Sequence, residues 1–502
     1  MIYFDVFTLS YLGVVFLFIC TVTAVHILLN KHEEPVSAVM WLILVFAFPG
    51  IGVLLYLLFG INKMNTKGLQ IKIAHELILD DLQKSSTVSV ERSSVHKALA
   101  NHLNEQHEYE FVGSVNDYPE YCRMLDRMLP DTIPLKGNKI SLLLDGTQAY
   151  PKMLKAIKNA KNSIHLQSYI IMNDEVGKEL FDALHEKAKN GVLVKVLYDR
   201  FGSWSAFSSF FFQKFIKDTP NLQIHSFSQL MPWAIQLRNH RKLIVIDGKK
   251  AFIGGINISR DNDSRSARKD RYIHDLHCEV EGPVVGELQF AFLRDWFFIK
   301  SSSTVELLKP EYFPHIKACG NSIARIVASG PGLDYEATEK VYMTAVSTAK
   351  NYIWLMTPYF VPDKAFLKAL CNCVARGVEV RIVIPAKNNH WYIQLATQSL
   401  YQKLLESGIR IYEKTAPFSH AKAMLIDGEW AKMGSSNCDI RSFRLNYELD
   451  FIIAEGDFIH QLHNQFKAEF DASTEVYIKD IMNKSILRQL AENTCALFTP
   501  VL

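Results

Sequence analysis

The chain has 502 residues, 49% of them hydrophobic, and its 55 lysines and arginines nearly balance 52 aspartates and glutamates, for a net charge of +3. This length fits roughly three or four domain-sized units, and the near-neutral charge argues against a nucleic-acid-binding protein, for which a strongly basic domain is expected. The eight cysteines are dispersed along the chain, which favours a reducing compartment over a disulfide scaffold.

Two long apolar segments open the chain. Neither 7–29 nor 36–61 contains Asp, Glu, Lys or Arg, and each matches the roughly 20 apolar residues needed to cross a bilayer. Because the link between them is short and polar, we expect 1–62 to form a hairpin of two transmembrane helices. A buried hairpin in a soluble core is the alternative. A cleaved signal peptide is disfavoured, since no basic residue precedes the first segment.

The hairpin would return both of its ends to the same side of the membrane. Lys63, Lys67 and Lys72 follow the second segment, whereas the link holds only Lys31 against two glutamates. Because cytoplasmic loops carry an excess of positive charge, this pattern predicts a cell-membrane protein with a cytoplasmic catalytic portion. A helical connector is expected at 63–137.

The rest of the chain repeats one pattern of apolar strands and amphipathic helices. The first copy, 138–310, has alternating strand and helix segments at 140–145, 150–160, 163–171, 177–188 and 192–197. The second copy, 311–502, has them at 323–329, 338–349, 352–360, 364–376 and 378–384, and ends in a further helix. This alternation predicts an α/β fold, and a duplicated unit can place two equivalent sites face to face across a pseudo-twofold axis.

Each copy carries the same set of histidine, lysine, aspartate and asparagine residues. The first set is His240, Lys242, Asp247 and Asn257, and the second is His420, Lys422, Asp427 and Asn437. A spacing of two puts histidine and lysine on one face of a strand, Asp-Gly makes a hairpin turn, and the returning strand brings the asparagine alongside. A lone His-x-Lys pair usually faces solvent, but two copies at matching spacings indicate a functional site.

These motifs resemble those of the phospholipase D superfamily, whose signature His-x-Lys-x-x-x-x-Asp followed by Gly-[Gly/Ser]-x-Asn is used in pairs. The cardiolipin synthase branch is the most similar, through the stretches 49–60, 357–363 and 441–448. The resemblance implies a pseudo-twofold pair of α/β/α sandwiches behind the hairpin. It also implies transfer of a phosphatidyl group from one phosphatidylglycerol to another, which gives cardiolipin and glycerol.

The same resemblance implies a phosphohistidine intermediate. One imidazole attacks phosphorus while the other protonates the departing glycerol oxygen, and the second then activates the hydroxyl of the next lipid. His240 is the nucleophile by resemblance, although a near-symmetric pair leaves the choice open. Lys242, Lys422, Asn257 and Asn437 would hold the phosphoryl oxygens. Because lysines supply the positive charge, neither a metal nor another cofactor is expected.

Further acidic residues accompany the motifs. Asp275 and Glu448 follow His240 and His420 at comparable distances, and the resemblance implies that they orient the histidines, within a copy or across the pseudo-twofold axis. A nucleophilic imidazole needs a fixed tautomer, which a carboxylate commonly sets. Asp247 and Asp427 belong to the catalytic signature, but their turn positions favour structural support over direct chemistry.

Several features leave alternatives open. The aromatic-rich segment 201–215 predicts either a membrane or acyl-chain contact or core packing. Gln167 departs from the acidic residue that the resemblance leads us to expect and has no assigned role, and His274, His277 and His390 are expected to be ordinary polar residues.

Phosphatidylglycerol and membrane lipid are the expected partners, nucleic acid is not, and the oligomeric state is open. The alternative functions are another phospholipase D or phosphatidyltransferase, a nuclease of the same superfamily, and a membrane scaffold.

Overall fold

The computed structural model describes residues 6–30, 35–60, 119–130, 132–227, 237–300, 309–331, 335–482 and 484–497. The chain divides into two compact units: the first contains the N-terminal helices, and the second contains the repeated α/β pattern. Most of the expected connector, 61–118, lies outside the described residues.

The N-terminal unit contains one long helix and several short ones. Among the described helices, α1 (Val6–Asn30) is the one long and apolar enough to cross a membrane, with a mean hydropathy of 2.1 over Gly13–Asn30. The second apolar segment is divided into α2 (Pro35–Ala47), α3 (Ile51–Leu55) and the π-helical turn Tyr56–Gly60. Gly50 turns the chain before α3 with a φ of 88°, a value that glycine adopts readily. The second segment therefore consists of short helices separated by a turn at Gly50 and is not one continuous helix.

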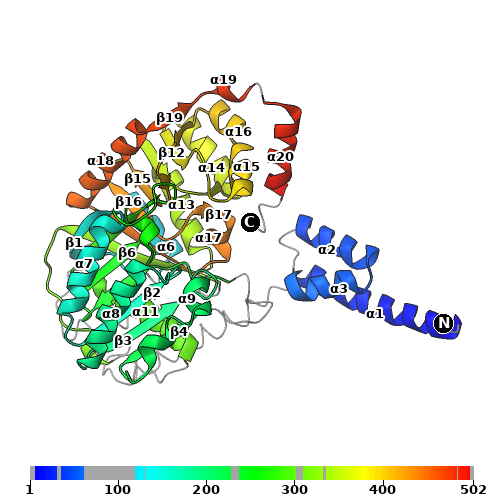
Figure 1. Ribbon diagram of the computed structural model, residues 1–502. Helices are drawn as coiled ribbons and strands as arrows, with labels where there is room; N and C mark the ends of the chain where they lie inside the picture. Colours follow the sequence, from blue (N-terminus) through cyan, green and yellow to red (C-terminus); the bar gives the residue numbers. More distant parts are fainter. Residues whose placement is uncertain are drawn as a thin grey trace. The chain divides into compact units, whose positions relative to one another are not determined.

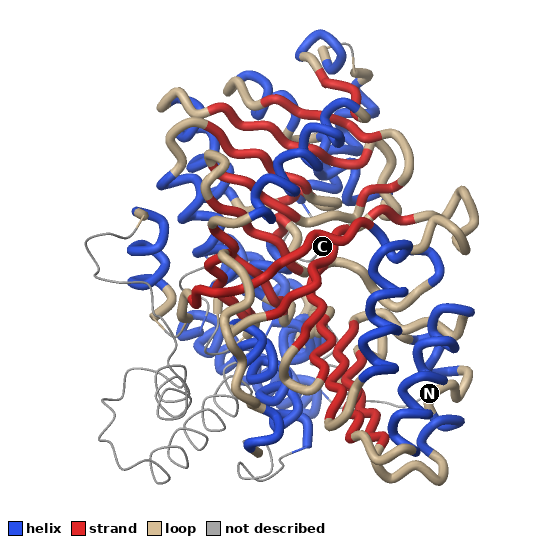
Figure 2. Tube along the Cα trace, turned by 90° about the vertical axis from the view of Figure 1, so that its left-hand side faces the viewer, coloured by secondary structure: helices blue, strands red, loops and turns tan. Residues whose placement is uncertain are grey.

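The main unit is built on one mixed sheet of fifteen described strands (Figure 2). The first repeat supplies β1 (Leu135–Leu144), β2 (Ser163–Ser168), β3 (Leu193–Tyr198), β4 (Leu222–Ser226), β5 (Leu243–Ile246), β6 (Lys250–Gly254) and β8 (Leu276–Glu281). The second supplies β9 (Ser322–Ser329), β10 (Tyr352–Met356), β12 (Glu379–Pro385), β13 (Arg410–Lys414), β15 (Ala423–Ile426), β16 (Trp430–Gly434), β18 (Glu448–Ala454) and β19 (Ser473–Val476). The predicted α/β repeat is confirmed.

The two repeats join edge to edge at the centre of this sheet. The strand order is β19-β13-β12-β10-β15-β16-β18-β9-β1-β8-β6-β5-β2-β3-β4, and β9 pairs antiparallel with β1, with Leu135 opposite Ala324. From that pair outward, equivalent strands follow in the same order in both directions. Two small sheets join further segments: β7 (Ile273–His274) pairs with β14 (Phe418–Ser419) across the repeats, and β11 (Phe360–Val361) pairs with β17 (Cys438–Asp439).

Helices cover both faces of the sheet (Figure 1). On one face lie α7 (Asp145–Asn159) and α8 (Glu175–Lys189) of the first repeat and α13 (Ala337–Thr348) and α14 (Lys364–Ala375) of the second. On the other face lie α11 (Val284–Lys300) and α18 (Asp457–Asp471), whose buried residues share one core with strands of both repeats. Because this core is continuous, the repeats hold each other in a defined orientation.

Shorter helices complete the main unit. They are α6 (Glu120–Met128), α9 (Trp204–Ser208), α10 (Gln213–Ile216), α15 (Trp391–Gln398), α16 (Tyr401–Glu406), α17 (Ile440–Arg444), α19 (Ile478–Ile481) and α20 (Ile486–Leu497), with 3-10 turns at Arg260–Asn262 and Pro310–Tyr312. Helix α6 packs on the second repeat, where Tyr121 stacks on Trp430 with ring centroids 4.8 Å apart. Helix α20 lies where the sequence predicts a final helix.

Candidate active site

The two His-x-Lys pairs lie in extended segments that lead into β5 and β15. The hairpins β5–β6 and β15–β16 follow. They turn at Asp247 and Asp427, which have φ values of 51° and 54°, each followed by a glycine with positive φ. The pairs therefore lie just before β5 and β15, at the ends of these strands opposite to the turns, and strand pairing within each hairpin fixes the strand that each pair leads into.

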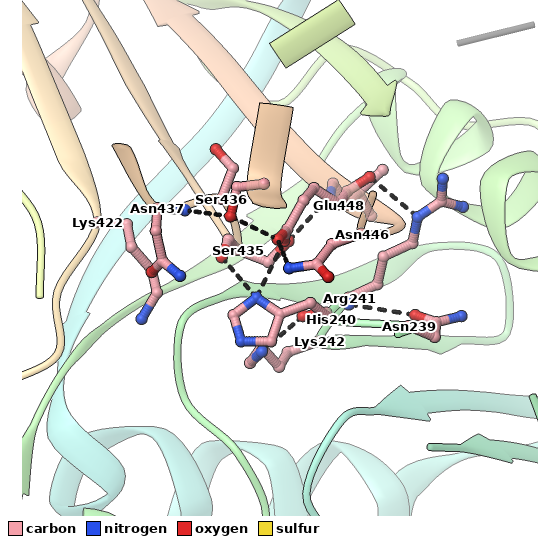
Figure 3. A network of polar contacts seen from close by, with 12 residues as sticks. Asn239, His240, Arg241, Lys242, Lys422, Ser435, Ser436, Asn437, Asn446 and Glu448 are labelled. Atoms are coloured by element: carbon pink, nitrogen blue, oxygen red, sulfur yellow. Dashed lines mark hydrogen bonds and ion pairs between the residues drawn. The ribbon is translucent and has the colours of Figure 1, made fainter. Parts of the chain in front are cut away.

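His240 is held by groups of the second repeat. Its Nδ1 lies 3.0 Å from Glu448 Oε2 and 2.9 Å from the carbonyl oxygen of Ser435 (Figure 3). Its backbone N–H donates to the carbonyl of Tyr447 at 2.9 Å. With Nδ1 engaged by acceptors, Nε2 is the ring nitrogen available to a substrate.

His420 is held in the same way by the first repeat. Its Nδ1 lies 2.7 Å from Asp275 Oδ2, and its backbone N–H donates to the carbonyl of His274 at 2.7 Å. Of the two arrangements left open by the sequence, the structure therefore has the exchanged one. Each histidine takes its carboxylate from the other repeat, so neither repeat alone contains a complete site.

Glu448 is fixed by several donors. Ser435 Oγ, Ser442 Oγ and Asn446 Nδ2 donate to its carboxylate at 2.5, 2.9 and 3.1 Å. Burial opposes ionisation, but the charge and hydrogen bond of His240, with the charge of Lys242, outweigh it and lower the pKa of Glu448 to about 2. An ionised carboxylate at this place selects the tautomer in which the proton of His240 is on Nδ1.

The two motif lysines are buried and close enough to affect each other. Burial, and then the charge of Lys422, lower the pKa of Lys242 to about 7. Burial lowers the pKa of Lys422 to about 8, against the attraction of Asp275 and Glu448. Figure 3 shows Lys422 and Asn437 beside His240 and Lys242. Each lysine charge disfavours the other, so an anion bound at this site would stabilise the charged forms of both lysines.

Both imidazoles favour the neutral state. Burial, and then the charge of Lys422, lower the pKa of His420 to about 3, and burial lowers the pKa of His240 against the attraction of Glu448. A phosphodiester anion would offset the lysine charges, and this would make protonation of one ring easier. One neutral and one protonated imidazole is the pair that acid–base catalysis requires.

The motif asparagines, one in each repeat, are nearly buried. Asn257 Oδ1 accepts a hydrogen bond from the backbone N–H of Ile170 at 3.1 Å, which leaves its NH2 group to donate elsewhere. The backbone N–H of Asn437 donates to Ser442 Oγ at 3.1 Å. The first contact orders the side chain of Asn257 without using its NH2 group, as a phosphate ligand requires, and the second fixes the backbone of Asn437.

The motif aspartates bind backbone and not the imidazoles. The carboxylate of Asp247 accepts the N–H groups of residues 161–163 at 2.7–2.9 Å, and that of Asp427 accepts those of residues 350–352 at 2.7–2.8 Å. Each therefore anchors the start of the neighbouring strand, β2 or β10. These contacts fit structural support and give no role in the chemistry.

Two tyrosines that the sequence analysis did not select line the site. Tyr169 lies edge-on to His240 with ring centroids 5.0 Å apart, and Lys242 Nζ is 5.3 Å from the Tyr169 ring. Tyr359 lies edge-on to His420 at 6.1 Å. Each follows the equivalent strand of its own repeat, β2 or β10, so an alignment of the two copies at these strands could have found them.

Arg241 makes a further connection that only the first motif has. Its NH1 is 2.7 Å from both carboxylate oxygens of Asp295, and its Nε donates to the backbone oxygen of Glu448 at 3.0 Å. Gln167, which had no role, donates to Asp295 at 2.7 Å. The corresponding residue of the second motif is Ala421, so this network belongs to the His240 half.

His274 differs from the expectation of an ordinary polar residue. Its imidazole lies 2.8 Å from Asp145 and 2.9 Å from Glu469, and Glu469 is also 2.5 Å from Lys414. Burial opposes protonation, but the hydrogen bonds and charges of Asp145 and Glu469 raise the pKa of His274 to about 9. A protonated His274 therefore links the two repeats, and its partner Asp145 also accepts the backbone N–H of Asp275 at 2.8 Å.

The aromatic-rich segment 201–215 has both buried and exposed side chains. Phe211, Phe212 and Phe215 are core residues, whereas Trp204 is 56% and Phe210 68% exposed, so the aromatic segment contributes to both core and surface.

Among the described residues, no group of three or more His, Cys, Asp or Glu side chains could hold a metal ion. The expectation that no metal is used stays a prediction.

Comparison with known proteins gives a consistent family. A model described as "Cardiolipin synthase, PLD-like domain" matches residues 153–296 and 342–470, and one described as "Phospholipase_D-nuclease N-terminal" matches 18–60. A cardiolipin synthase of Halalkalibacterium halodurans is 31% identical over 96% of this chain and 93% of its own length. The major cardiolipin synthase ClsA of Bacillus subtilis is 32% identical over 95% and 96%. The crystal structure of a Haemophilus influenzae phosphatidylserine synthase is similar in fold, with a TM-score of 0.58 and 14% identity, over 76% of this chain and 97% of that one.

Proposed function

Since the chain belongs to the cardiolipin synthase family and is a phosphatidyltransferase of the phospholipase D type, we propose that it joins two phosphatidylglycerol molecules into cardiolipin and glycerol at the His240–His420 site. The observation that carries the assignment of this site is the exchange of carboxylates. Glu448 of the second repeat orients His240, and Asp275 of the first orients His420. Both imidazoles are thereby oriented through Nδ1 at one site that also contains Lys242 and Lys422.

In the first half-reaction, His240 Nε2 attacks the phosphorus of phosphatidylglycerol. The N–P bond forms while the P–O bond to the glycerol headgroup breaks, and protonated His420 gives its proton to the leaving glycerol oxygen. Glu448 offsets the positive charge that develops on His240. The negative charge on the phosphoryl oxygens is held by Lys242 and Lys422 and by the two motif asparagines.

In the second half-reaction, His420 is neutral and acts as the base. It removes a proton from the headgroup hydroxyl of a second phosphatidylglycerol, the new P–O bond forms and the N–P bond breaks. Because exchange of one phosphodiester for another is nearly thermoneutral, the product depends on which acceptor reaches the phosphohistidine. A lipid hydroxyl must therefore reach the site in preference to water.

The N-terminal unit would provide the membrane anchor. Helix α1 meets the length and hydropathy needed to span a bilayer, and apolar side chains such as Leu17, Phe18 and Leu29 are 62–71% exposed. We propose that 1–62 forms the membrane hairpin of a cell-membrane protein, with the catalytic portion in the cytoplasm. The other proposed domains are a connector at 63–137 and repeats at 138–310 and 311–502; β1 already begins at Leu135, so the first repeat starts slightly earlier.

The test uses the purified full chain with phosphatidylglycerol as the sole lipid. We expect equimolar cardiolipin and glycerol, both lost in His240→Ala and His420→Ala. The phosphoenzyme should be labile in acid and stable in base, as an N–P bond is. Phosphatidic acid as the main product would identify a hydrolase instead. Cardiolipin that forms only after phosphatidylethanolamine is added would change the assigned lipid pair.

A further inference from the structure

Helix α20 has an unusual orientation. Ile486, Leu487, Leu490 and Leu497 are 62–83% exposed and lie on its outer side, here called the α20 stripe, with the exposed Asn493 and Thr494 between Leu490 and Leu497. The inner side carries Glu492, which is 3% exposed and pairs with Lys484 and Arg488 at 2.8 and 3.0 Å. A surface helix normally turns its apolar side toward the core. In α20 that side faces outward, so water is an unfavourable neighbour for it.

The α20 stripe is connected to the active site through packed residues. Helix α20 packs on α15, whose first residue, Trp391, is 68% exposed. The residues just before α15 contact the site: Asn389 accepts a hydrogen bond from Tyr359 at 3.0 Å, and the His390 ring lies 5.8 Å from that of Tyr359. Tyr359 in turn lies against His420. The α20 stripe and Trp391 are therefore exposed apolar groups on two packed helices, and the residues before α15 connect them to the second histidine through Tyr359.

We propose that the α20 stripe and Trp391 dock onto the surface of the lipid bilayer that holds the substrate. This inference rests on the proposed function, because a diacyl phospholipid keeps its acyl chains in the bilayer while its phosphate must reach two nearly buried histidines. An amphipathic helix lies in the interface with its apolar side inserted, and tryptophan favours the same depth. Docking here would bring the side of the site that contains Tyr359 to the headgroup region.

The first repeat offers a second apolar surface next to the site. Helix α9 follows Ser203, whose hydroxyl donates to the backbone oxygen of Tyr169 at 3.0 Å, and Tyr169 lies against His240. Trp204 and Phe210 are exposed in this region. Each histidine thus has exposed aromatic residues near its own tyrosine, as expected if lipids approach the site from both repeats.

The kinetic test compares Leu490→Glu with Gln489→Glu in the purified full chain. Both variants add one negative charge to exposed positions of α20, but Gln489 lies off the stripe. On vesicles of long-chain phosphatidylglycerol, Leu490→Glu should slow cardiolipin formation by about tenfold or more, because a charge replaces inserted apolar surface. Gln489→Glu should have no such effect. With short-chain phosphatidylglycerol dissolved as monomers, both variants should match the wild type.

Each outcome has a distinct meaning. Equal loss on vesicles and on monomers would show that Leu490 supports the fold, and no loss on vesicles would show that the stripe does not meet lipid; either overturns the docking. A wild-type chain that makes no cardiolipin from either substrate would instead overturn the proposed function.

A spin label gives independent evidence. It would be placed at Leu490→Cys of the full chain in nanodiscs, with the described accessible cysteines Cys319, Cys371 and Cys495 replaced by serine. Collisions with oxygen should exceed those with a water-soluble nickel chelate. A label open to the chelate, or shielded from both reagents by a second copy or another segment, would overturn the proposal.

Discussion

Glu448→Gln is the substitution that most directly tests the exchanged carboxylates. The carboxylate accepts hydrogen bonds from His240 and from three further donors. Its pKa is lowered from 4.5 to about 2, so its surroundings favour the charged form by about 3 kcal/mol, at about 1.4 kcal/mol for each tenfold. Glutamine keeps the shape of the side chain but removes its charge, and its NH2 group would face hydrogen-bond donors in place of a carboxylate oxygen.

The consequence should appear in the formation of the phosphoenzyme. His240 gains positive charge as it attacks, and losing up to about 3 kcal/mol of stabilisation at that step corresponds to a rate lower by up to about 150-fold. We expect kcat to fall by this factor, with a smaller change in KM, when rapid quenching measures the labelled phosphoenzyme. Glu279→Gln, the same change at a carboxylate on β8 paired with Lys152 and Lys250, is the matched control.

A clear result would refute this reasoning. If Glu448→Gln folds with a normal melting temperature and forms the phosphoenzyme within about threefold of the wild-type rate, Glu448 does not assist the nucleophile. If Asp275→Asn then causes the larger loss in the same step, the roles of the two histidines are reversed.

Four further outcomes follow. Gly255→Ala should abolish transfer, because an added Cβ would lie 2.1 Å from Asp275 Oδ1, whereas Gly286→Ala, whose Cβ would meet nothing within 4 Å, should keep normal activity. The value of kcat/KM should fall as pH rises through 7 to 8, where the pKa values of Lys242 and Lys422 lie, since the neutral amines no longer hold the phosphodiester; a constant value up to pH 9 would contradict this. The pKa of His274 is raised from 6.5 to about 9, so its stabilisation is complete below 6.5 and is lost as pH rises through 9; the melting-temperature difference between wild type and His274→Gln should therefore be large at pH 6 and shrink above pH 9. Finally, His420→Ala should still form the phosphoenzyme from a lipid with a p-nitrophenol leaving group, which needs no proton, and His240→Ala should not; the opposite pattern would make His420 the nucleophile.

Much of this organisation could be predicted from the sequence because it is local. The His-x-Lys spacing, the Asp-Gly turn and the returning glycine–asparagine segment all lie within one hairpin, and the duplicated pattern shows that there are two such hairpins. The family prediction is confirmed by relatives that match nearly the whole chain. The predicted strands also lie close to the observed ones, since apolar alternation reports burial in a sheet.

Which carboxylate serves which histidine could not be predicted, because that pairing depends on how the repeats dock. Glu448 is 208 residues from His240, and Asp275 is 145 residues from His420. They meet because β1 and β9 join two sheets edge to edge and one core holds both repeats. No pattern within one copy contains that information. His274 was missed for the same reason, since Asp145 and Glu469 approach it from opposite repeats.

Small differences between the copies give the best reason to assign different roles to the two histidines. At the position of Gly255, whose lack of a side chain makes room for Asp275, the second copy has Ser435, whose hydroxyl donates to Glu448. Glu448 therefore receives hydrogen bonds from additional neutral donors, which stabilise its charge and fix its position. A carboxylate held in this way suits the orientation of a nucleophilic histidine. Asp275 instead has Lys422 3.8 Å away, and the His420 ring also contacts that lysine. A proton held on His420 is thus sensitive to the charge bound at the site, as a group that must gain and lose a proton in each turnover requires.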